Sequence, residues 1–452
     1  MAGKKTQAQL TPEEKLRQAL VPEAEQPYKV PENWCWTRLG NVTNIIMGQS
    51  PNGGSITENE KDTPLIGGAA DMGEKYPEIK RYTNKPTKIS SDEDLIICVR
   101  ATLGKPIFSD GRYCLGRGVA AIRPLVGSRK LYKYFFLNFE QYLFDNATGT
   151  TFAQVNSNIL QKMPLLLPPL AEQQRIVERI ESLFAKLDEA KENLQNVLEG
   201  FETRKAAILH KAFTGELTAN WRKQHGVSME SWEEKKLEET SIEIIDGDRG
   251  INYPKKEEFT ANGYCVFLNT KNVTVNGFNF DRVEFISKSK DDILRKGKLK
   301  RGDIVLTTRG TIGNIALYDE NIHFENMRIN SGMVIYRNGN EFFKHFLIHL
   351  YRSRFITKQI KCLQTGSAQP QLPIKIMKNL KLIIPTFSEQ IEIVRIIDDL
   401  LAKEQQAKEL AENALAKVDL IKKAILAHAF RGKLGTNNLA DEPAVELLKR
   451  VL

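Results

Sequence analysis

Apolar residues recur every three or four positions in two stretches of the chain, from Ile176 to Phe201 and from Ile393 to Ile425. Steps that alternate between four and three residues form a heptad seam, which predicts long helices packed along a partner helix. Gly200 interrupts the first stretch, and Glu404 occupies one seam position of the second. The residues predicted to lie in the inter-helix seam are Ile180, Leu183, Leu187, Leu194, Ile397, Leu400, Val418 and Ile421.

An internal repeat organises the chain, because segments 168–217 and 385–434 match without gaps at a shift of 217 residues. The segments before them are less alike. Each half is therefore predicted to contain one variable module followed by one constant helix. A helix of about 43 residues would be about 65 Å long and needs a partner to stabilise it. We expect the two helices to pack on each other as an antiparallel coiled coil about a pseudo-twofold axis.

The variable modules contain short β-like runs, such as 95–99 and 304–306, separated by Gly, Asn, Asp and Lys. Each module ends with a helical stretch, which predicts a mixed α/β domain and an α+β fold class for the chain. The expected order is an N-terminal extension with a short helix (1–33), a first variable domain (34–169), a helical spacer (170–216), a linker (217–231), a second variable domain (232–386), a second helical spacer (387–434) and a C-terminal tail helix (435–452). We expect this tail helix to pair with the N-terminal helix near residues 12–20.

Composition agrees with a protein of several domains, since 452 residues exceed one ordinary core. A net charge of +9 and a pI near 9.0 favour a polyanionic partner, although many soluble proteins are mildly basic. No stretch approaches the roughly 18 consecutive apolar residues of a membrane span, so we expect a cytoplasmic protein. The five cysteines show neither a disulfide framework nor a zinc-binding spacing.

Motifs for catalysis are missing from the sequence. No loop reads G-x-x-x-x-G-K-[ST], no G-x-G-x-x-G opens a helix, and Pro168-Pro169 lacks a preceding Asn or Asp that could hold an adenine. His345 and His349 have the spacing of zinc ligands on a helix but no third ligand, and 246–248 resembles only the start of a calcium loop. We therefore predict no catalytic site and no metal site.

Two repeated loops, 100–105 and 309–314, combine a guanidinium, a hydroxyl, an ammonium or amide, and glycines. These groups suit DNA contact, whereas the alternative is a glycine turn whose arginine pairs with a local carboxylate. The polar clusters 148–154 and 365–371 add glutamines that can recognise adenine, unless they are solvated loops. The lysine-rich run 288–301 attracts phosphates or is simply solvated. The candidate DNA-contact residues are Arg100, Thr102, Lys105, Arg117, Thr150, Thr151, Gln154, Arg309, Thr311, Asn314, Arg328, Asn330, Ser331, Ser367, Gln369 and Gln371.

Two variable domains, each followed by a near-duplicate helix that begins Pro-x-x-x-Glu-Gln and ends Ala-Phe-x-Gly-x-Leu, resemble the specificity subunit of Type I restriction-modification enzymes over roughly residues 30–434. The resemblance implies that each variable domain is a target recognition domain for one half of a bipartite DNA sequence, and that the helices fix the gap between the halves. It also implies that the repeated motif residues contact partner subunits. These residues are Glu172, Gln173, Phe213, Glu389, Gln390 and Phe430.

The same resemblance implies a non-catalytic chain that binds no cofactor. Two modification subunits would carry S-adenosylmethionine and methylate adenine N6, and two motor-nuclease subunits would use ATP and Mg²⁺ for restriction. Two other interpretations stay open. A coiled-coil scaffold with two protein-binding end domains predicts no salt-dependent DNA affinity, and a nuclease with an unrecognised site predicts activity from the purified chain alone.

Overall fold

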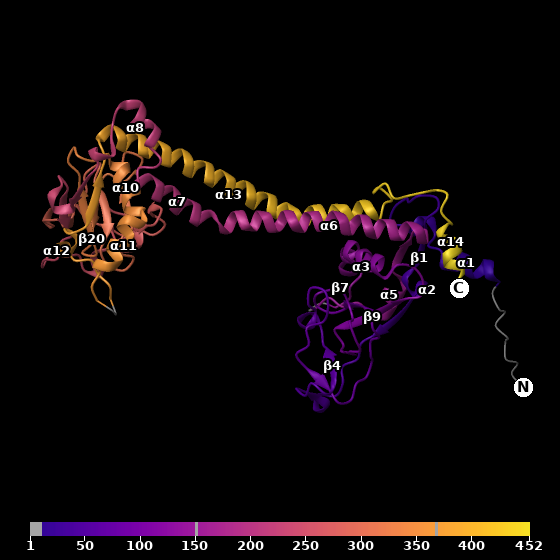
Figure 1. Cartoon of the computed structure of the whole chain (residues 1–452). Helices are drawn as coiled ribbons and strands as arrows, with labels where there is room; N and C mark the ends of the chain where they lie inside the picture. The colour runs from indigo at the N-terminus through magenta and orange to yellow at the C-terminus, as the bar shows by residue number, and fades with distance from the viewer. Residues whose placement is uncertain (1–10, 150–151, 367–368) are drawn as a thin grey trace, which may run out of the picture. The chain divides into compact units, whose positions relative to one another are not determined.

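The computed structural model describes residues 11–149, 152–366 and 369–452. The chain divides into two compact units: unit 1 contains residues 1–194 and 414–452, and unit 2 contains residues 195–413. Each unit combines a sheet-bearing domain with segments of two long helices (Figure 1). Both units mix helices and sheets, in agreement with the expected α+β class. We refer to residues 34–169 as domain 1 and to residues 232–386 as domain 2.

Domain 1 is built on a four-stranded antiparallel sheet with the strand order β2-β9-β6-β7. In β6, Leu95 and Ile97 pack in one core cluster, whereas Ile96 and Cys98 pack in another. Because successive side chains of a strand point to opposite faces, this sheet is covered on both sides. The four strands are β2 (Thr43–Met47), β9 (Val119–Pro124), β6 (Leu95–Cys98) and β7 (Gly104–Phe108).

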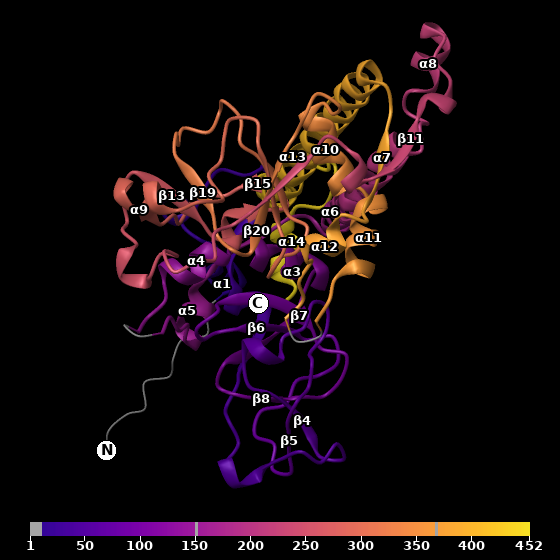
Figure 2. The same cartoon turned by 90° about the vertical axis from the view of Figure 1, so that its left-hand side faces the viewer.

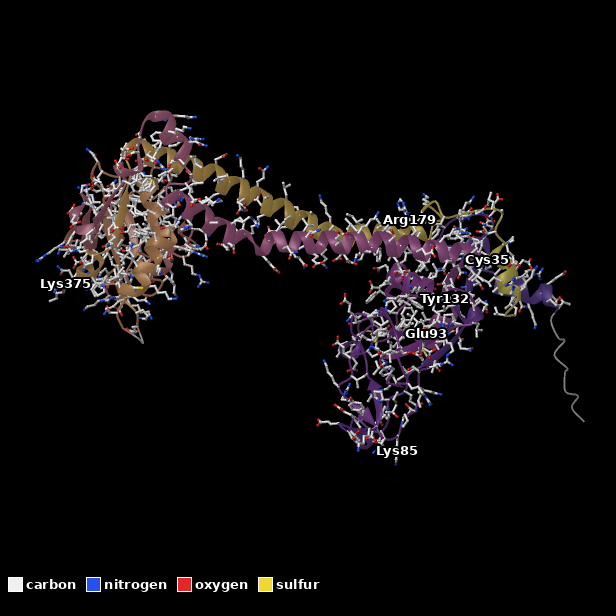
Figure 3. The ribbon with its side chains drawn as sticks, viewed as in Figure 1. Cys35, Lys85, Glu93, Tyr132, Arg179 and Lys375 are labelled. Atoms are coloured by element: carbon white, nitrogen blue, oxygen red, sulfur yellow. The ribbon has the colours of Figure 1, made fainter. Side chains whose placement is uncertain are left out.

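Helix α3 (Arg129–Asn138) packs on β7 and separates the sheet of domain 1 from the long helix α6 (Figure 1). The rings of Tyr134 and Phe184 meet edge to face, with centroids 5.8 Å apart. Tyr132 lies in this layer, and Lys85 lies at the end of the domain away from α6 (Figure 3). The other elements are β3 (Ile56–Thr57), β4 (Thr63–Ile66), β5 (Tyr82–Thr83), β8 (Cys114–Leu115), α2 (Leu39–Val42), α4 (Glu140–Asp145) and α5 (Ser157–Lys162).

Domain 2 repeats the topology of the main sheet, with the order β12-β20-β17-β18. A second sheet, with the order β16-β13-β19, lies on the side of β20 away from helices α11 and α12 (Figure 2). The main sheet consists of β12 (Glu243–Asp246), β20 (Met333–Arg337), β17 (Ile304–Thr307) and β18 (Ile315–Leu317). The other elements are β13 (Cys265–Leu268), β14 (Val273–Thr274), β15 (Gly277–Phe278), β16 (Phe285–Ile286), β19 (Met327–Ile329), α9 (Lys288–Ile293), α10 (Lys344–Arg352), α11 (Arg354–Leu363) and α12 (Ile374–Met377).

A two-stranded antiparallel ribbon joins each domain to the helix that follows it. In unit 1, β1 (Cys35–Arg38) pairs with β10 (Pro164–Leu167), and in unit 2, β11 (Glu233–Lys236) pairs with β21 (Lys381–Ile384). The linker expected at 217–231 contains a short helix, α8 (Ala219–His225).

The long helices are α6 (Leu170–Glu199), α7 (Phe201–Phe213) and α13 (Phe387–Ala429). The interruption expected at Gly200 is confirmed, since it separates α6 from α7. In unit 2, the ion pair between Arg204 and Glu404 (2.8 Å) joins α7 to α13. The glutamate that breaks the apolar pattern therefore has a cationic partner on the neighbouring helix.

One of the residues expected in the seam faces solvent. In unit 1, Ile421 is 44% exposed, and Lys422 takes its place beside α6. The Lys422 ammonium lies 2.5 Å from Asp188 and 5.1 Å from the ring centroid of Phe184. The other expected seam residues are buried (Ile180, Ile397, Val418) or half-buried (Leu183, Leu187, Leu194, Leu400).

The two ends of the described chain meet in unit 1, as expected for the tail helix. Helix α1 (Pro12–Ala19) contacts α14 (Ala444–Lys449), and the Lys15 ammonium donates a hydrogen bond of 3.1 Å to the carbonyl oxygen of Leu452. No helix in the described ranges combines the length and the apolar character needed to cross a membrane.

Candidate nucleic-acid interface

In domain 1, two polar segments that are far apart in sequence lie side by side. The loop between β6 and β7 places Arg100 in an antiparallel bridge with Gln154, and the amide of Ala101 donates to the carbonyl of Ala153 (2.9 Å). Ala101 and Lys105 have positive φ angles of 59° and 52°, which L-residues rarely adopt. The loop is therefore held in one specific conformation by its hydrogen bonds to the second segment.

Domain 2 repeats this arrangement. Arg309 forms an antiparallel bridge with Gln371. Gln371 also forms a bridge with Thr365, just as Gln154 forms one with Thr148 in domain 1. Gly310 and Gly313 have φ angles of 69° and 91° and supply the tight turns of this loop. The structure thus joins each predicted contact loop to the predicted glutamine cluster of its own domain.

The side chains of these loops are available to a ligand. Neither Arg100 nor Arg309 forms a salt bridge or a side-chain hydrogen bond with any residue in the described ranges. The alternative, in which each arginine pairs with a local carboxylate, therefore does not hold. Gln371 is half-buried, and the exposed members are Arg100, Thr102, Lys105, Gln154, Arg309, Thr311 and Gln369. The predicted residues Thr150, Thr151 and Ser367 lie outside the described residues.

A second group of predicted residues lies beside the first. Arg117 is exposed, and its Nε donates to the hydroxyl of Ser50 (3.2 Å). In domain 2, the side-chain oxygen of Asn330 accepts from the amide of Gly332 (2.9 Å), and the carbonyl oxygen of Gly332 accepts from the amide of Thr308 (2.8 Å). Asn330 and Ser331 are therefore next to the Arg309 loop.

The prediction for Arg328 is wrong. Its side chain is buried, its guanidinium pairs with the buried carboxylate of Asp291, and it also donates to the carbonyl oxygens of Lys296 (2.7 Å) and Leu294 (3.0 Å). A guanidinium that is buried among these partners is not accessible to DNA. Arg328 ties helix α9 to strand β19.

Asn314 also has an internal partner. Its amide nitrogen donates to the carbonyl oxygen of Val273 (2.9 Å), and the residue is half-buried. The side chain anchors the β14–β15 hairpin to the loop. Its role is to shape the loop, unlike that of Lys105, which is the exposed residue at the matching position of domain 1.

The Glu-Gln motif residues are buried inside the chain, so the prediction that they contact partner subunits is wrong. Glu172 accepts hydrogen bonds from the Trp34 indole (2.6 Å), Thr436 (3.1 Å) and Asn437 (2.9 Å). In unit 2, Glu389 accepts from Trp232 (2.9 Å), Thr218 (2.7 Å) and the guanidinium of Arg222 (2.6 Å). Each glutamate joins a long helix to the β-ribbon strand region and to the segment that follows the other long helix.

The neighbouring glutamines lock the same junctions. Gln173 accepts from the amide of Ser128 (2.7 Å) and donates to the carbonyl oxygen of Pro168 (2.9 Å). Gln390 accepts from the amide of Phe343 (2.8 Å) and donates to the carbonyl oxygen of Pro385 (3.0 Å). These bonds hold each long helix against its own domain.

The two motif phenylalanines complete domain cores, which also contradicts a role at a subunit interface. Phe430, at the end of α13, meets Phe135 of α3 edge to face at 5.8 Å. Phe213, at the end of α7, meets Phe346 of α10 at 5.5 Å. Each domain is thus packed against the C-terminal end of the helix that follows the other domain in sequence.

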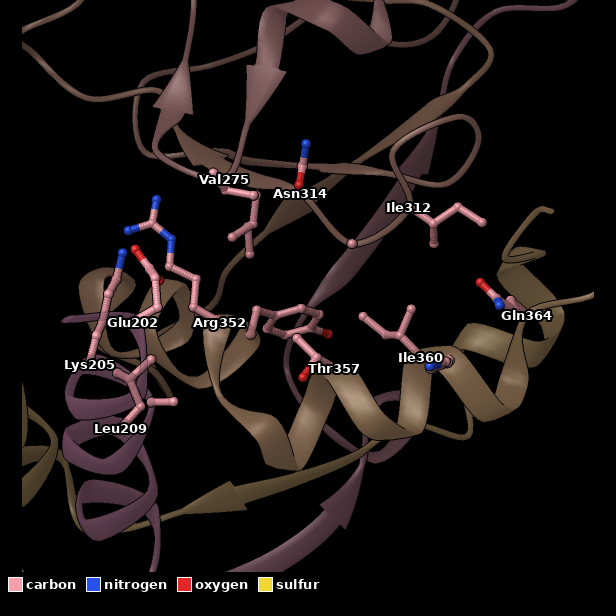
Figure 4. Close-up of a pocket in the computed structure, with 15 residues that line it drawn as sticks. Glu202, Lys205, Leu209, Val275, Ile312, Asn314, Arg352, Thr357, Ile360 and Gln364 are labelled. Carbon is pink, nitrogen blue, oxygen red and sulfur yellow. The ribbon is translucent and has the colours of Figure 1, made fainter. Parts of the chain in front are cut away.

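A cavity of about 510 Å³ lies behind the loop 309–314, between that loop, α7 and α11 (Figure 4). Ile312 lines it from the loop, Leu209 from α7 and Ile360 from α11. The Nε atom of Arg352 is buried there without a hydrogen-bond acceptor among the described residues, and burial lowers the pKa of this guanidinium. Ile312 packs against the core cluster that contains Leu209 and Ile360, so apolar contacts and backbone hydrogen bonds both support the loop on this side.

The histidine pair has a structural partner. His349 forms a hydrogen bond of 2.9 Å with Asp398, and this bond, together with the positive charge around it, lowers the pKa of that carboxyl group. No group of three metal-ligating side chains occurs within the described part of the chain. All five cysteines are free, and only Cys362 is exposed.

Comparison with known proteins identifies the family. A model of the Type I restriction modification DNA specificity domain matches residues 31–200 and again residues 229–413. The chain belongs to this specificity family. The EcoBI specificity subunit of Escherichia coli is 27% identical over 436 residues, which cover 91% of this chain and 88% of that protein. A putative MjaX specificity subunit of Methanocaldococcus jannaschii is 32% identical over 195 residues, 42% of this chain and 44% of that protein.

The fold is also that of a solved member of the specificity family. The HsdS subunit from Thermoanaerobacter tengcongensis matches with a TM-score of 0.62 and 19% identity, over 91% of this chain and 100% of that chain.

Sequence reasoning missed several residues of the candidate interface. Thr270 packs beside Gly310 and Gly332, and Lys271 is exposed next to it. Arg249 is exposed beside Ser331. No motif marks these residues, and only the strand pairing of the folded domain brings them to the Arg309 loop.

Proposed function

We propose that this chain is the DNA sequence-specificity subunit of a Type I restriction-modification complex and performs no catalysis itself. The observation that carries the proposal is the duplicated surface in both domains of a member of the specificity family. In each domain an exposed arginine, which has no side-chain partner among the described residues, is bridged to a glutamine. A guanidinium suits phosphate or guanine, and a glutamine amide suits adenine. Each domain would recognise one half of a bipartite sequence.

The long helices would act as a spacer between the two half-sites, paired as an antiparallel coiled coil with a pseudo-twofold relation between the halves. The equal sheet topologies and the ion pair between Arg204 and Glu404 support this arrangement. Half-sites must lie at a set helical phase on one duplex, which a rigid spacer provides.

Partner subunits would supply the chemistry. Two modification subunits would bring S-adenosylmethionine for adenine methylation, and two restriction subunits would bring ATP and Mg²⁺. Because the Glu-Gln motifs are buried, the docking surface must lie elsewhere on the helices. Leu420 and Ile421 of α13 are 67% and 44% exposed, which is unusual for adjacent large apolar residues. We assign them to the contact with a modification subunit.

The test is methylation in cells that express this chain with the modification subunit encoded beside it. Sequencing that detects methyladenine should find one bipartite motif, and exchange of residues 34–169 for those of another family member should change only one half of it. Methylation without a split motif, or a change in both halves, would refute the proposal. Cleavage by the purified chain alone would instead support a nuclease, and an absence of salt-dependent DNA binding would support a protein scaffold.

The spacer role has its own test. Because the ion pair between Arg204 and Glu404 fixes the register, a four-residue insertion near Gly200 should be matched by four residues inserted in α13 near position 405. Each insertion adds about one helical turn, or roughly 6 Å. The gap between half-motifs should then lengthen, and an unchanged gap would refute the spacer role.

A further inference from the structure

The two domains place an arginine at the same structural position from opposite strands. Strand β2 ends with Met47 opposite Ala120, and β12 ends with Asp246 opposite Val334. A glycine follows in each case, and a Cβ atom on either glycine would collide with the carbonyl oxygen of the facing strand segment. The last paired residues of the two domains therefore correspond, and counting outward from them aligns the residues that follow. Ser50 corresponds to Arg249, and Arg117 corresponds to Ser331.

Within each domain, the arginine and the serine of this correspondence contact each other. In domain 1, the Nε of Arg117 donates to the hydroxyl of Ser50 (3.2 Å). In domain 2, Nη2 of Arg249 approaches the carbonyl oxygen of Ser331 (3.4 Å). The same point of the surface carries one guanidinium and one serine, although the strand that supplies the arginine differs. The feature that the two domains share at this point is therefore a guanidinium beside a serine.

This point adjoins the recognition loop of each domain. Gly118, next to Arg117, accepts a hydrogen bond from the amide of Val99 (2.9 Å), one residue before Arg100. Gly332, next to Ser331, accepts from the amide of Arg309 (3.2 Å). Arg100 and Arg117 of domain 1 therefore belong to one exposed surface, and so do Arg309 and Arg249 of domain 2.

In domain 2, the Asp-Gly-Asp motif holds this surface together. Asp246 pairs with the guanidinium of Arg249 (3.1 Å), and Asp248 accepts from the amides of Gly250 (2.9 Å) and Arg295 (2.8 Å). Backbone hydrogen bonds, first that of Gly250, lower the pKa of Asp248, so it stays a strong acceptor. The motif thus fixes two loops, and Lys296 and Arg295 from the second loop are exposed beside Arg249.

We propose that Arg117 and Arg249 bind equivalent backbone phosphates of the DNA, one in each half-site, with Arg295 and Lys296 extending the phosphate-binding surface of domain 2. The inference rests on the proposed function. Two domains that recognise different half-sequences share only the sugar-phosphate backbone as a common ligand. A charge kept in both domains is therefore matched to phosphate rather than to a base, and the planar guanidinium suits its oxygens.

The test uses the full chain and a fluorescent mixed-sequence duplex of about 40 base pairs, titrated at several salt concentrations. Each phosphate contact contributes about 0.9 to the slope of log affinity against log salt. We expect R249S to lower the slope by about 0.9, and the R249S/S331R variant to restore it, because domain 1 holds its arginine on that strand. In domain 1, R117S should give the same loss and R117S/S50R the same recovery. Lys236 on β11, also exposed, provides the control K236S, for which no change is expected.

Each outcome decides the matter. An unchanged slope in R249S, with normal binding by the wild-type chain, would overturn the inference and leave the proposed function standing. A loss in R249S that S331R does not restore would overturn the shared position. A wild-type chain with no salt-dependent binding would overturn both. The substituted arginines and Lys236 are exposed and the two serines are half-buried, so an unchanged thermal melting temperature of each variant checks that the fold is intact.

Discussion

Substitution of the two buried motif glutamates should have very different consequences, although the residues occupy matching positions of the repeat. Glu389 faces the guanidinium of Arg222, whose side chain is only 9% exposed, and the two form an ion pair with no solvent access on the carboxylate side. Among the described residues, the donors to Glu172 are all neutral: the indole of Trp34 and the side chains of Thr436 and Asn437.

The expected magnitudes follow from these partners. Removal of the charge in E389Q leaves a buried guanidinium without a counter-charge, which costs about 3–5 kcal/mol. In E172Q, the remaining carbonyl oxygen can still accept from Trp34 and the new amide group can donate to the hydroxyl of Thr436. That substitution should cost about 1 kcal/mol, the value of one ordinary hydrogen bond.

Hydrogen exchange followed by mass spectrometry suits the measurement, because a protein with two units need not unfold in one step. Peptides from β11, β21 and the start of α13 should lose most of their protection in E389Q, whereas the equivalent peptides of unit 1 should change little in E172Q. Replacement of both partners, in R222M/E389L, should recover much of the loss because no isolated charge remains. Equal losses in E172Q and E389Q would refute the assignment of the difference to Arg222.

Three further predictions concern other parts of the chain. Burial would raise the pKa of Asp291, but hydrogen bonds from Lys298 and Arg328 and the charges of these two residues lower it overall. The contribution of Asp291 to stability is therefore present above the ordinary pKa of an aspartate and is lost as the pH falls through the lowered pKa. D291N should flatten the acid limb of the unfolding free energy of unit 2, and an unchanged limb would contradict this. L420E should prevent co-purification with the modification subunit, whereas L439E, at an equally exposed leucine, should not; equal effects would argue against the assigned surface. Q371A should reduce the discrimination against wrong bases in the half-motif that domain 2 recognises by about 1–3 kcal/mol, as measured by methylation of variant sites. A uniform loss of methylation across sequences would argue for a phosphate contact instead.

Local patterns in the sequence predicted where the long helices lie. They predicted less well which residues of α13 face the neighbouring helix. The heptad spacing and Gly200 determine where helices run and break, because these depend on neighbouring residues. Ile421 was wrongly placed in the seam because the pattern treats every lysine as solvated. The ammonium of Lys422 lies over the ring of Phe184 and pairs with Asp188, and an amphipathic side chain can occupy such a site.

Long-range partners limited the prediction of the site. The repetition of the Glu-Gln motif indicated that both halves need these residues. A single sequence does not distinguish a residue repeated at a buried junction from one repeated at a binding surface. Arg328 looked like a contact residue because Asp291, its partner, lies 37 residues away. The arginine loops and their glutamines were identified from residue types alone, whereas the bridge that joins Arg309 to Gln371 required the folded domain.

Comparison of the two domains distinguishes the side chains that both share from those that only one domain has. Arg100 and Arg309 match in position, in exposure and in their bridge to a glutamine, and the exchanged pair places a second arginine next to each loop. A half-site differs from its counterpart in bases and not in backbone, so these shared groups are suited to phosphates. The end of the loop has diverged, since Lys105 is exposed whereas Asn314 is bonded to Val273. Base discrimination that differs between the two domains should therefore be sought at such unmatched positions, whereas the matched glutamines can recognise an adenine in either half-site. Substitution of Lys105 should alter the sequence preference of domain 1, while the salt dependence of binding changes by no more than one phosphate contact.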